Sequence, residues 1–232
     1  MSHNHVDILW PCELDEQTKI QLMSIVKPIT GIAHFVNRSE LTNQRRGVYY
    51  VRKGIVAIAF SPEGPNSMNS GILSHGLWIG GGVMMGQQFM RAAFEEIEPL
   101  ELFFFQKDKI EQLAESNPFI YKWLYYGSLD TQKIWISAQV ASLHDKEVRI
   151  VSALLDLLNR SKTIKGSVPE IKVSQKQLSI ITGISRPRLN EVLKLLESSQ
   201  EITLARGKIY LTDLEALTKR TKALDIILPK NK

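Results

Sequence analysis

The sequence predicts an α+β fold with an N-terminal β roll of the jelly-roll type, a long helix and a C-terminal winged helix-turn-helix. Short β-rich runs broken by Gly, Pro, Asn and Ser fill residues 29–106, and apolar residues recur every three or four positions across 118–145. Two capped helices and two short strands follow in 172–211. The predicted domains are 1–117, 118–145 and 146–232.

The N-terminal region predicts one helix and several strands. Apolar residues at helical spacing predict a helix over 14–26, which Pro28 ends. Runs rich in β-branched and aromatic residues predict strands at 29–36, 47–52, 55–61, 75–79 and 100–106. Gly54 predicts a tight turn between two of these strands, and 63–71 predicts a loop.

Two apolar stripes run along the predicted long helix. The first consists of Ile120, Leu124, Gly127, Thr131, Ile134, Ala138 and Ala141. The second consists of Leu129, Ile136, Val140 and Leu143. Two stripes predict a helix that packs on its own β roll and on a second copy of the chain; the alternative is a core helix of a monomer. Residues 144–147 predict a hinge, and a further helix over 148–158 begins the C-terminal domain.

The helix-turn-helix is predicted from its caps and its turn. Ser174 and Gln177 fit a capping box at the start of the first helix, and Gly183 suits a tight turn. Ser185 predicts a second N-cap, with Pro187 in the first turn of that helix. One face of the second helix carries an apolar stripe of Leu189, Val192, Leu193 and Leu196. An ordinary helical hairpin from an unrelated domain is the alternative.

The opposite face of the second helix predicts contact with double-stranded DNA, because a recognition helix places this face in the major groove. Strands over 201–205 and 208–211 predict a wing with a basic tip. The candidate DNA-contacting residues are Gln175, Ser185, Arg186, Arg188, Asn190, Glu191, Lys194, Arg206 and Lys208.

The charge of the chain is concentrated at its C-terminal end. Residues 172–232 contain 12 Lys and Arg against 6 Asp and Glu, a net charge of +6. The whole chain has a net charge of +5, so the remaining residues sum to about −1. Cys12 is the single cysteine, which excludes an intrachain disulfide. The sequence shows no signal peptide and no apolar run of about 18 residues, so we expect a cytoplasmic protein without a membrane partner.

The order of these parts resembles the Crp/Fnr (catabolite activator) family of bacterial transcription regulators. The resemblance is strongest in Gly183–Arg186 and Val192–Glu197, and the segment Tyr49–Val56 supports it. It implies a cyclic-nucleotide-binding-like β roll that senses an effector, and a homodimer that reads a palindromic operator. It also implies RNA polymerase as a partner.

The effector-binding segment departs from the family pattern. Cyclic-nucleotide binders of the family carry Gly-Glu, a short helix, and then Arg before a small residue. Here Gln87 follows Gly86, and Arg91-Ala92 comes too soon for the usual helix, so the cassette is degenerate. The resemblance therefore implies an unknown small-molecule effector other than cyclic AMP, contacted by Gly86, Gln87, Arg91 and Ala92. Dependence on a cyclic nucleotide and constitutive action with a vestigial pocket are the alternatives.

The DNA-facing helix also departs from the family. Arg186 is retained, Pro187 replaces the usual Glu, and Glu191 stands where a later Arg is common. Arg reads guanine, whereas Glu accepts a hydrogen bond, for example from cytosine N4. The resemblance therefore implies an operator unlike the family's best-known site, with Arg186 or Arg188 on guanine and Asn190 on adenine. Gln175 and Lys208 are expected to contact phosphates.

No cofactor is predicted. The cysteine cluster of the family's oxygen sensors is absent, and His34 and His75 are isolated candidates for a haem axial ligand. A metal-dependent jelly-roll enzyme fused to a DNA-binding domain needs converging His and Glu ligands, which the sequence spacing does not offer. We expect a regulator that is not an enzyme and holds no metal.

Overall fold

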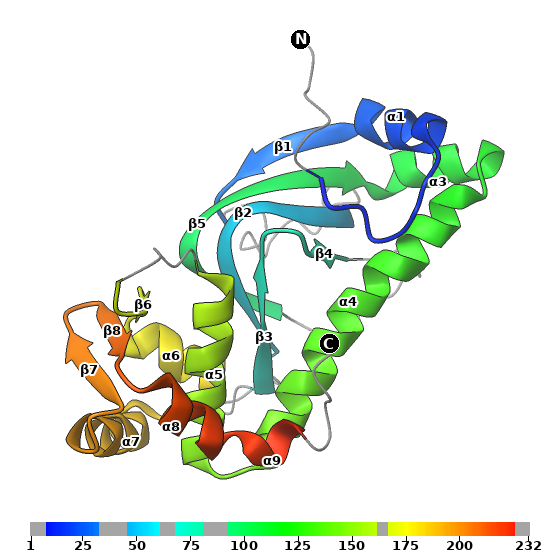
Figure 1. Ribbon diagram of the computed structural model, residues 1–232. Coiled ribbons are helices and arrows are strands. Elements are labelled where there is room, and N and C mark those ends of the chain that lie inside the picture. Colours follow the sequence, from blue (N-terminus) through cyan, green and yellow to red (C-terminus); the bar gives the residue numbers. More distant parts are fainter. Residues whose placement is uncertain (1–7, 33–45, 61–67, 81–91, 162–166, 226–232) are drawn as a thin grey trace. The chain divides into compact units, whose positions relative to one another are not determined.

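The computed structural model describes residues 8–32, 46–60, 68–80, 92–161 and 167–225 (Figure 1). Two compact units divide the chain near residue 133. The first unit contains most of the large sheet and the helices that pack on it. The second unit contains residues 134–232 together with the segments 57–72 and 91–97.

The large sheet has five strands in the order β1-β5-β2-β3, with β4 paired to β2. The strands are β1 (Val26–Thr30), β2 (Gly47–Phe60), β3 (Met68–Ser74), β4 (Trp78–Ile79) and β5 (Ala92–Gln106). The first strand was predicted three residues too late, because Pro28 was expected to end a helix. Pro28 instead lies in β1, opposite Phe103 of β5. Because β1 is an edge strand, it tolerates a residue that lacks a backbone N–H.

Gly54 does not form the predicted turn. The two strands expected on either side of it are one continuous strand, β2, in which Gly54 has φ +89°. A Cβ at this position would lie 2.2 Å from the carbonyl oxygen of Pro99. The glycine therefore permits a close backbone approach inside the sheet, which is the other reason for a glycine within a strand pattern.

The boundaries of three more strands differ from the prediction. Met68–Gly71, expected in a loop, belong to β3, and β4 is confined to Trp78–Ile79 because Gly76, at φ +91°, turns the chain before it. β5 begins at Ala92, eight residues earlier than predicted. These strands are defined by pairing with distant segments, which residue type alone does not encode.

Helices account for most of the remaining structure (Figure 1). The first unit contains α1 (Glu16–Ser24), α3 (Lys107–Ser116) and the start of α4 (Phe119–Ser142). The second contains α5 (Lys146–Arg160), α6 (Gln175–Thr182), α7 (Arg186–Ser198), α8 (Leu214–Arg220) and α9 (Lys222–Asp225). It also contains a small sheet of β6 (Glu170–Ile171), β8 (Lys208–Leu211) and β7 (Ile202–Ala205), in that order. The helix α3 was not predicted from the sequence.

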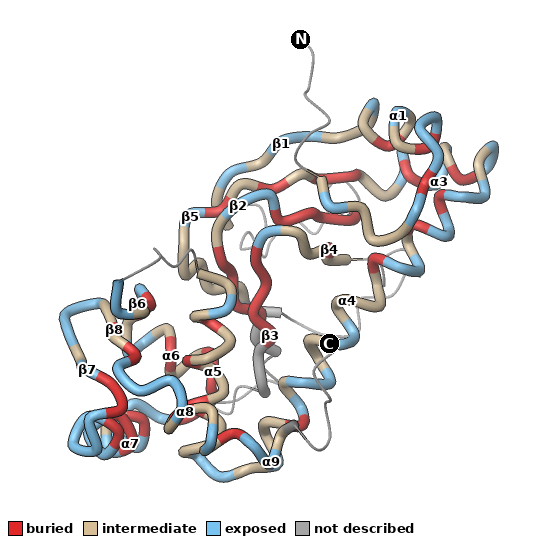
Figure 2. Tube along the Cα trace, viewed as in Figure 1, coloured by how far each residue is buried: buried red, intermediate tan, exposed pale blue. Residues whose placement is uncertain are grey.

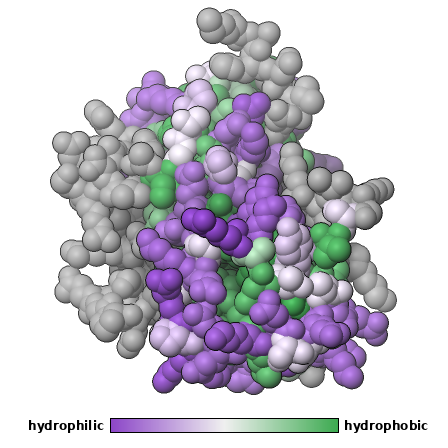
Figure 3. Space-filling view, turned by 90° about the vertical axis from the view of Figure 1, so that its left-hand side faces the viewer, coloured by the Kyte–Doolittle hydropathy of each residue, from purple (hydrophilic) through white to green (hydrophobic). Residues whose placement is uncertain are grey.

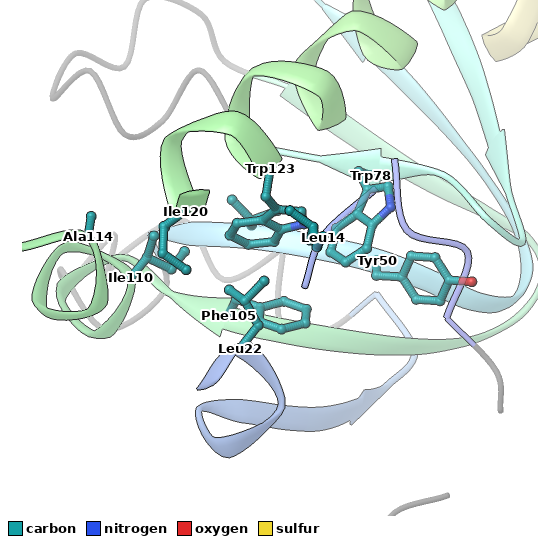
Figure 4. Close-up of a cluster of buried hydrophobic side chains, with 10 residues drawn as sticks. Leu14, Leu22, Tyr50, Trp78, Phe105, Ile110, Ala114, Ile120 and Trp123 are labelled. Carbon is teal, nitrogen blue, oxygen red and sulfur yellow. The ribbon is translucent and has the colours of Figure 1, made fainter. Parts of the chain in front are cut away.

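The core of the first unit is a cluster of aromatic and aliphatic side chains (Figure 4). Trp78 and Trp123 pack edge to face with ring centroids 5.3 Å apart, and Phe105 lies 5.3 Å from Trp123. Tyr50 packs on Trp78 at 4.8 Å. This arrangement places β2, β4 and β5 against the start of α4.

The first predicted stripe of α4 is buried where it meets this core. Ile120 is fully buried, and Thr131 donates a hydrogen bond of 2.7 Å to the backbone oxygen of Trp78. An added Cβ at Gly127 would lie in ordinary van der Waals contact with the Trp78 Cβ, at 3.4 Å, so this face of the helix lies directly against Trp78. The first stripe therefore packs on the chain's own β roll, which is one of the two surfaces on which the helix was predicted to pack; the sequence did not assign a stripe to either surface.

A second face of α4 is apolar and exposed in the single chain. Val140 is the one buried member of the predicted second stripe, and Leu129 is half-buried. The large exposed side chains that share this helical face are Tyr121, Tyr125, Ile136 and Leu143.

Candidate DNA-binding interface

The first helix of the motif, α6, has the predicted start and end. The side chain of Ser174 accepts from the Gln177 N–H, and the Gln177 side chain bonds back to the Ser174 backbone, which completes the capping box. At the other end Gly183 has φ +65°, a left-handed conformation that suits glycine. The turn between the two helices is therefore set by signals within ten residues of sequence.

The second helix, α7, is held by its apolar stripe rather than by its cap. All four predicted stripe residues are buried: Leu189, Val192, Leu193 and Leu196. Pro187 lies in the first turn, as predicted. Ser185 occupies the N-cap position, but its side chain accepts no hydrogen bond, so the prediction of a side-chain cap was wrong. Figure 2 shows both buried and exposed residues on α7, and the buried ones recur every three or four positions.

Polar contacts fix the neighbouring elements around these two helices. Arg149 of α5 donates to the backbone oxygen of Thr182 at the end of α6. Arg220 of α8 donates at 2.7 Å to Glu201, which is almost fully buried, and also pairs with Glu147 of α5. Hydrogen bonding to Glu201 raises the pKa of the Arg220 guanidinium, so this group stays charged. We call the group of Arg220, Glu201 and Glu147 the α5–α8 clasp.

The face of α7 away from the core is cationic at its start. Arg186 and Arg188 are exposed in the first turn, and Lys194 is exposed two turns later. The Arg186 side chain makes neither a hydrogen bond nor an ion pair with another residue in the described part of the chain. In the space-filling view of Figure 3, hydrophilic side chains cover most of the coloured surface.

A groove of about 300 Å³ lies between the start of α6 and the wing. Its lining includes four basic residues, Lys176, Arg186, Arg206 and Lys208, and also Gln175. Arg206 is exposed at the tip of the wing. Four predicted residues therefore line one groove: Gln175, Arg186, Arg206 and Lys208. Lys176 lines it too and was not predicted, although it directly follows Gln175.

Three predicted residues have intramolecular surroundings that the sequence did not reveal. Lys208 donates to Glu170 at 3.0 Å, which raises the pKa of its ammonium group. Glu191 accepts from Lys146 of α5 at 2.9 Å. Asn190 was predicted on the exposed face of α7, but its Oδ1 atom is buried. This atom has no hydrogen-bond partner among the described residues. No signal in the sequence links Lys146 to Glu191, 45 positions away.

The predicted effector residues fall largely outside the described part of the chain. Gly86, Gln87 and Arg91 are outside it, and Ala92 is the first residue of β5. His34 is also outside it, whereas the Nδ1 atom of His75 lies 2.7 Å from the backbone oxygen of Arg52. Within the described ranges, no group of three or more His, Cys, Asp and Glu side chains could hold a metal ion.

The fold and the cationic helix define a helix-turn-helix protein of the DNA-binding class. Residues 148–220 match the family model of the Crp-like helix-turn-helix domain. The cAMP-activated global transcriptional regulator CRP of Pasteurella multocida (strain Pm70) is 28% identical over 165 residues, which are 69% of this chain and 78% of that protein.

Solved structures of regulators share the fold over most of the chain. The c-di-GMP responsive global regulator CLP of Xanthomonas campestris has a TM-score of 0.65 at 19% identity, covering 85% of this chain and 99% of that one. TTHA1359, a transcriptional regulator of the CRP/FNR family from Thermus thermophilus, has a TM-score of 0.58 at 21% identity, covering 77% and 89%.

Residues 148–220 form a Crp-like helix-turn-helix domain, and the chain is similar over most of its length to transcription regulators of the Crp/Fnr family. These similarities confirm the predicted fold class. Among the helices of the described ranges, none has the length and apolar character required to cross a membrane.

Proposed function

We propose that the chain acts as a homodimer that reads a palindromic operator with α7, under the control of a small molecule bound by the β roll. The observation that carries the DNA-reading part is the exposed Arg186 and Arg188 in the first turn of α7, beside the basic groove. An arginine at this position of a recognition helix can bond guanine O6 and N7 in the major groove. Lys176, Arg206 and Lys208 are placed for phosphates, which position the protein without reading sequence.

The exposed stripe of α4 supports the homodimer. Tyr121, Tyr125 and Ile136 are 62%, 60% and 54% exposed, and Leu143 is 82% exposed. Apolar residues sharing one face of a long helix are typical of a helix pair. A second copy of the same helix would bury the stripe symmetrically. Sedimentation equilibrium should give a dimer for the native chain and a monomer for Ile136→Glu, while Phe119→Glu, off the stripe on the same helix, should leave the dimer intact.

The proposal also concerns which small molecule acts as the effector. CRP of Pasteurella multocida is named as cAMP-activated and CLP of Xanthomonas campestris as c-di-GMP responsive, so cyclic nucleotides are the first candidates to test. The absence of a Gly-Glu pair in 80–92 favours an effector other than cyclic AMP. Contact with RNA polymerase, also implied by the family, belongs to the same proposal.

The test is selection of sites from a randomised DNA pool at fixed salt, without nucleotide, with cyclic AMP, and with c-di-GMP. Enrichment of palindromes without nucleotide is the expected result, and enrichment with cyclic AMP alone would overturn the effector assignment. Arg186→Ala or Arg188→Ala should relax the guanine preference at one position and cost about 1–3 kcal/mol of binding. Lys109→Ala, an exposed charge on α3, is the matched control and should change nothing. Selection of no sequence by the native chain would remove the proposed function.

A further inference from the structure

We propose that Lys146 is a positioning residue for base recognition: it holds Glu191 of α7 so that one carboxylate oxygen is presented to a cytosine amino group. This inference rests on the proposed reading of DNA by α7. It adds a residue outside the helix-turn-helix to the determinants of operator sequence.

The geometry of the pair carries the inference. Lys146 is the first residue of α5, and its Nζ donates to Glu191 Oε2 at 2.9 Å. The side chain of Glu191 is 63% exposed, and that of Lys146 is 49% exposed. The lysine bond therefore engages one oxygen of an otherwise open carboxylate. The remaining oxygen, Oε1, keeps its acceptor capacity.

The charges around Glu191 explain why a carboxylate can be tolerated on this face. The hydrogen bond and the charge of Lys146 hold the pKa of the Glu191 carboxyl below its usual value, and Arg188 adds to the effect. Glu191 is therefore an anion on a helix that approaches phosphates, where an unpaired anion would be repelled. The positive charges of Lys146 and Arg188 offset that repulsion.

The chemistry of the exposed oxygen selects the base. A carboxylate can only accept hydrogen bonds, and in the major groove cytosine offers its N4 amino group as a donor. Without Lys146 the Glu191 side chain would lose the hydrogen bond that orients it, so the preference for cytosine would weaken. Lys146 therefore acts through Glu191 rather than by touching a base itself.

The experiment is a double-mutant cycle read out as base preference at every position of the operator half-site. Native protein, Lys146→Ala, Glu191→Ala, the double variant and Lys146→Arg are compared against single-base variants of the selected site. We expect Glu191→Ala to abolish a cytosine preference of about tenfold at one position. Lys146→Ala should lower the same preference several-fold and leave other positions unchanged. The double variant should match Glu191→Ala, and Lys146→Arg should retain most of the preference.

Two results would overturn the inference. If Lys146→Ala weakens binding equally to all sequences, Lys146 contacts phosphate only. If Glu191→Ala changes no base preference, Glu191 reads no base. Thermal unfolding of each variant shows whether the fold is intact, and Lys219→Ala on α8 controls for loss of one positive charge. Failure of the native chain to select any site is a separate result that removes the proposed function instead.

Discussion

The first unit has an aromatic core and the second an aliphatic one. Trp78, Phe105 and Trp123 meet from three segments that are far apart in the sequence (Figure 4). In the second unit, the buried stripe of α7 lies within eight residues of one helix, Leu189 to Leu196. The first unit therefore depends on which strands pair, whereas the helix-turn-helix depends on residues next to each helix.

The largest loss of unfolding free energy is expected when a glycine of the first unit, Gly54, is replaced, and a glycine of the second unit, Gly207, provides the comparison. Gly54→Ala places a Cβ 2.2 Å from a backbone oxygen of Pro99 at φ +89°, which neither strand can relieve. We expect it to cost more than about 4 kcal/mol of unfolding free energy, or to prevent folding. Gly207→Ala in the wing, with φ +72° but open space around it, should cost about 1–2 kcal/mol. Urea titration measures both, and equal costs would contradict the account of Gly54.

These glycines also show what the sequence could predict. Gly183 was correctly expected in a turn, because helix caps flank it directly, and the connection between the two predicted strands of the wing contains Gly207. The role of Gly54 was predicted wrongly, because the residue that requires a glycine there is Pro99, which lies on another strand 45 residues away. The same reason explains the missed β3 and the early start of β5, which are defined by pairing partners rather than by their own residues.

In the candidate DNA-binding interface, too, some features were predictable from the sequence and others were not. The stripe, the turn and the exposed arginines of α7 follow from spacing along one helix, and sequence predicted them. The partners of Glu191, Lys208 and Glu201 lie 45, 38 and 19 residues away, so their pairing required the tertiary structure.

The next prediction tests the α5–α8 clasp in the second unit. Arg220→Ala leaves Glu201, which is 5% exposed, as a buried carboxylate without its cation. Removing one partner of a buried pair costs about 3–5 kcal/mol. Lys208→Ala breaks a pair whose two side chains are over a third exposed and should cost less than about 1 kcal/mol. Similar losses for the two variants in urea titration would show that the clasp is not a buried pair in energetic terms.

A smaller difference is expected between the two tryptophans of the aromatic core. Trp78 donates its indole N–H to the backbone oxygen of Leu9 at 2.9 Å. The buried indole N–H of Trp123 has no partner among the described residues. Trp78→Phe loses a hydrogen bond and Trp123→Phe does not, so Trp78→Phe should cost about 1 kcal/mol more. Chemical unfolding of the two variants gives this difference, and an equal or reversed cost would refute it.

The smallest prediction returns to the two serines that begin the helices of the motif. Ser174 accepts a hydrogen bond from the Gln177 N–H, whereas Ser185 makes no side-chain cap. Ser174→Ala should therefore cost about 1 kcal/mol of unfolding free energy. Ser185→Ala should cost a few tenths of that, because α7 is held by its buried stripe and its proline. A comparable loss for both variants would mean that Ser185 caps α7 in solution and that the two helices begin in the same way.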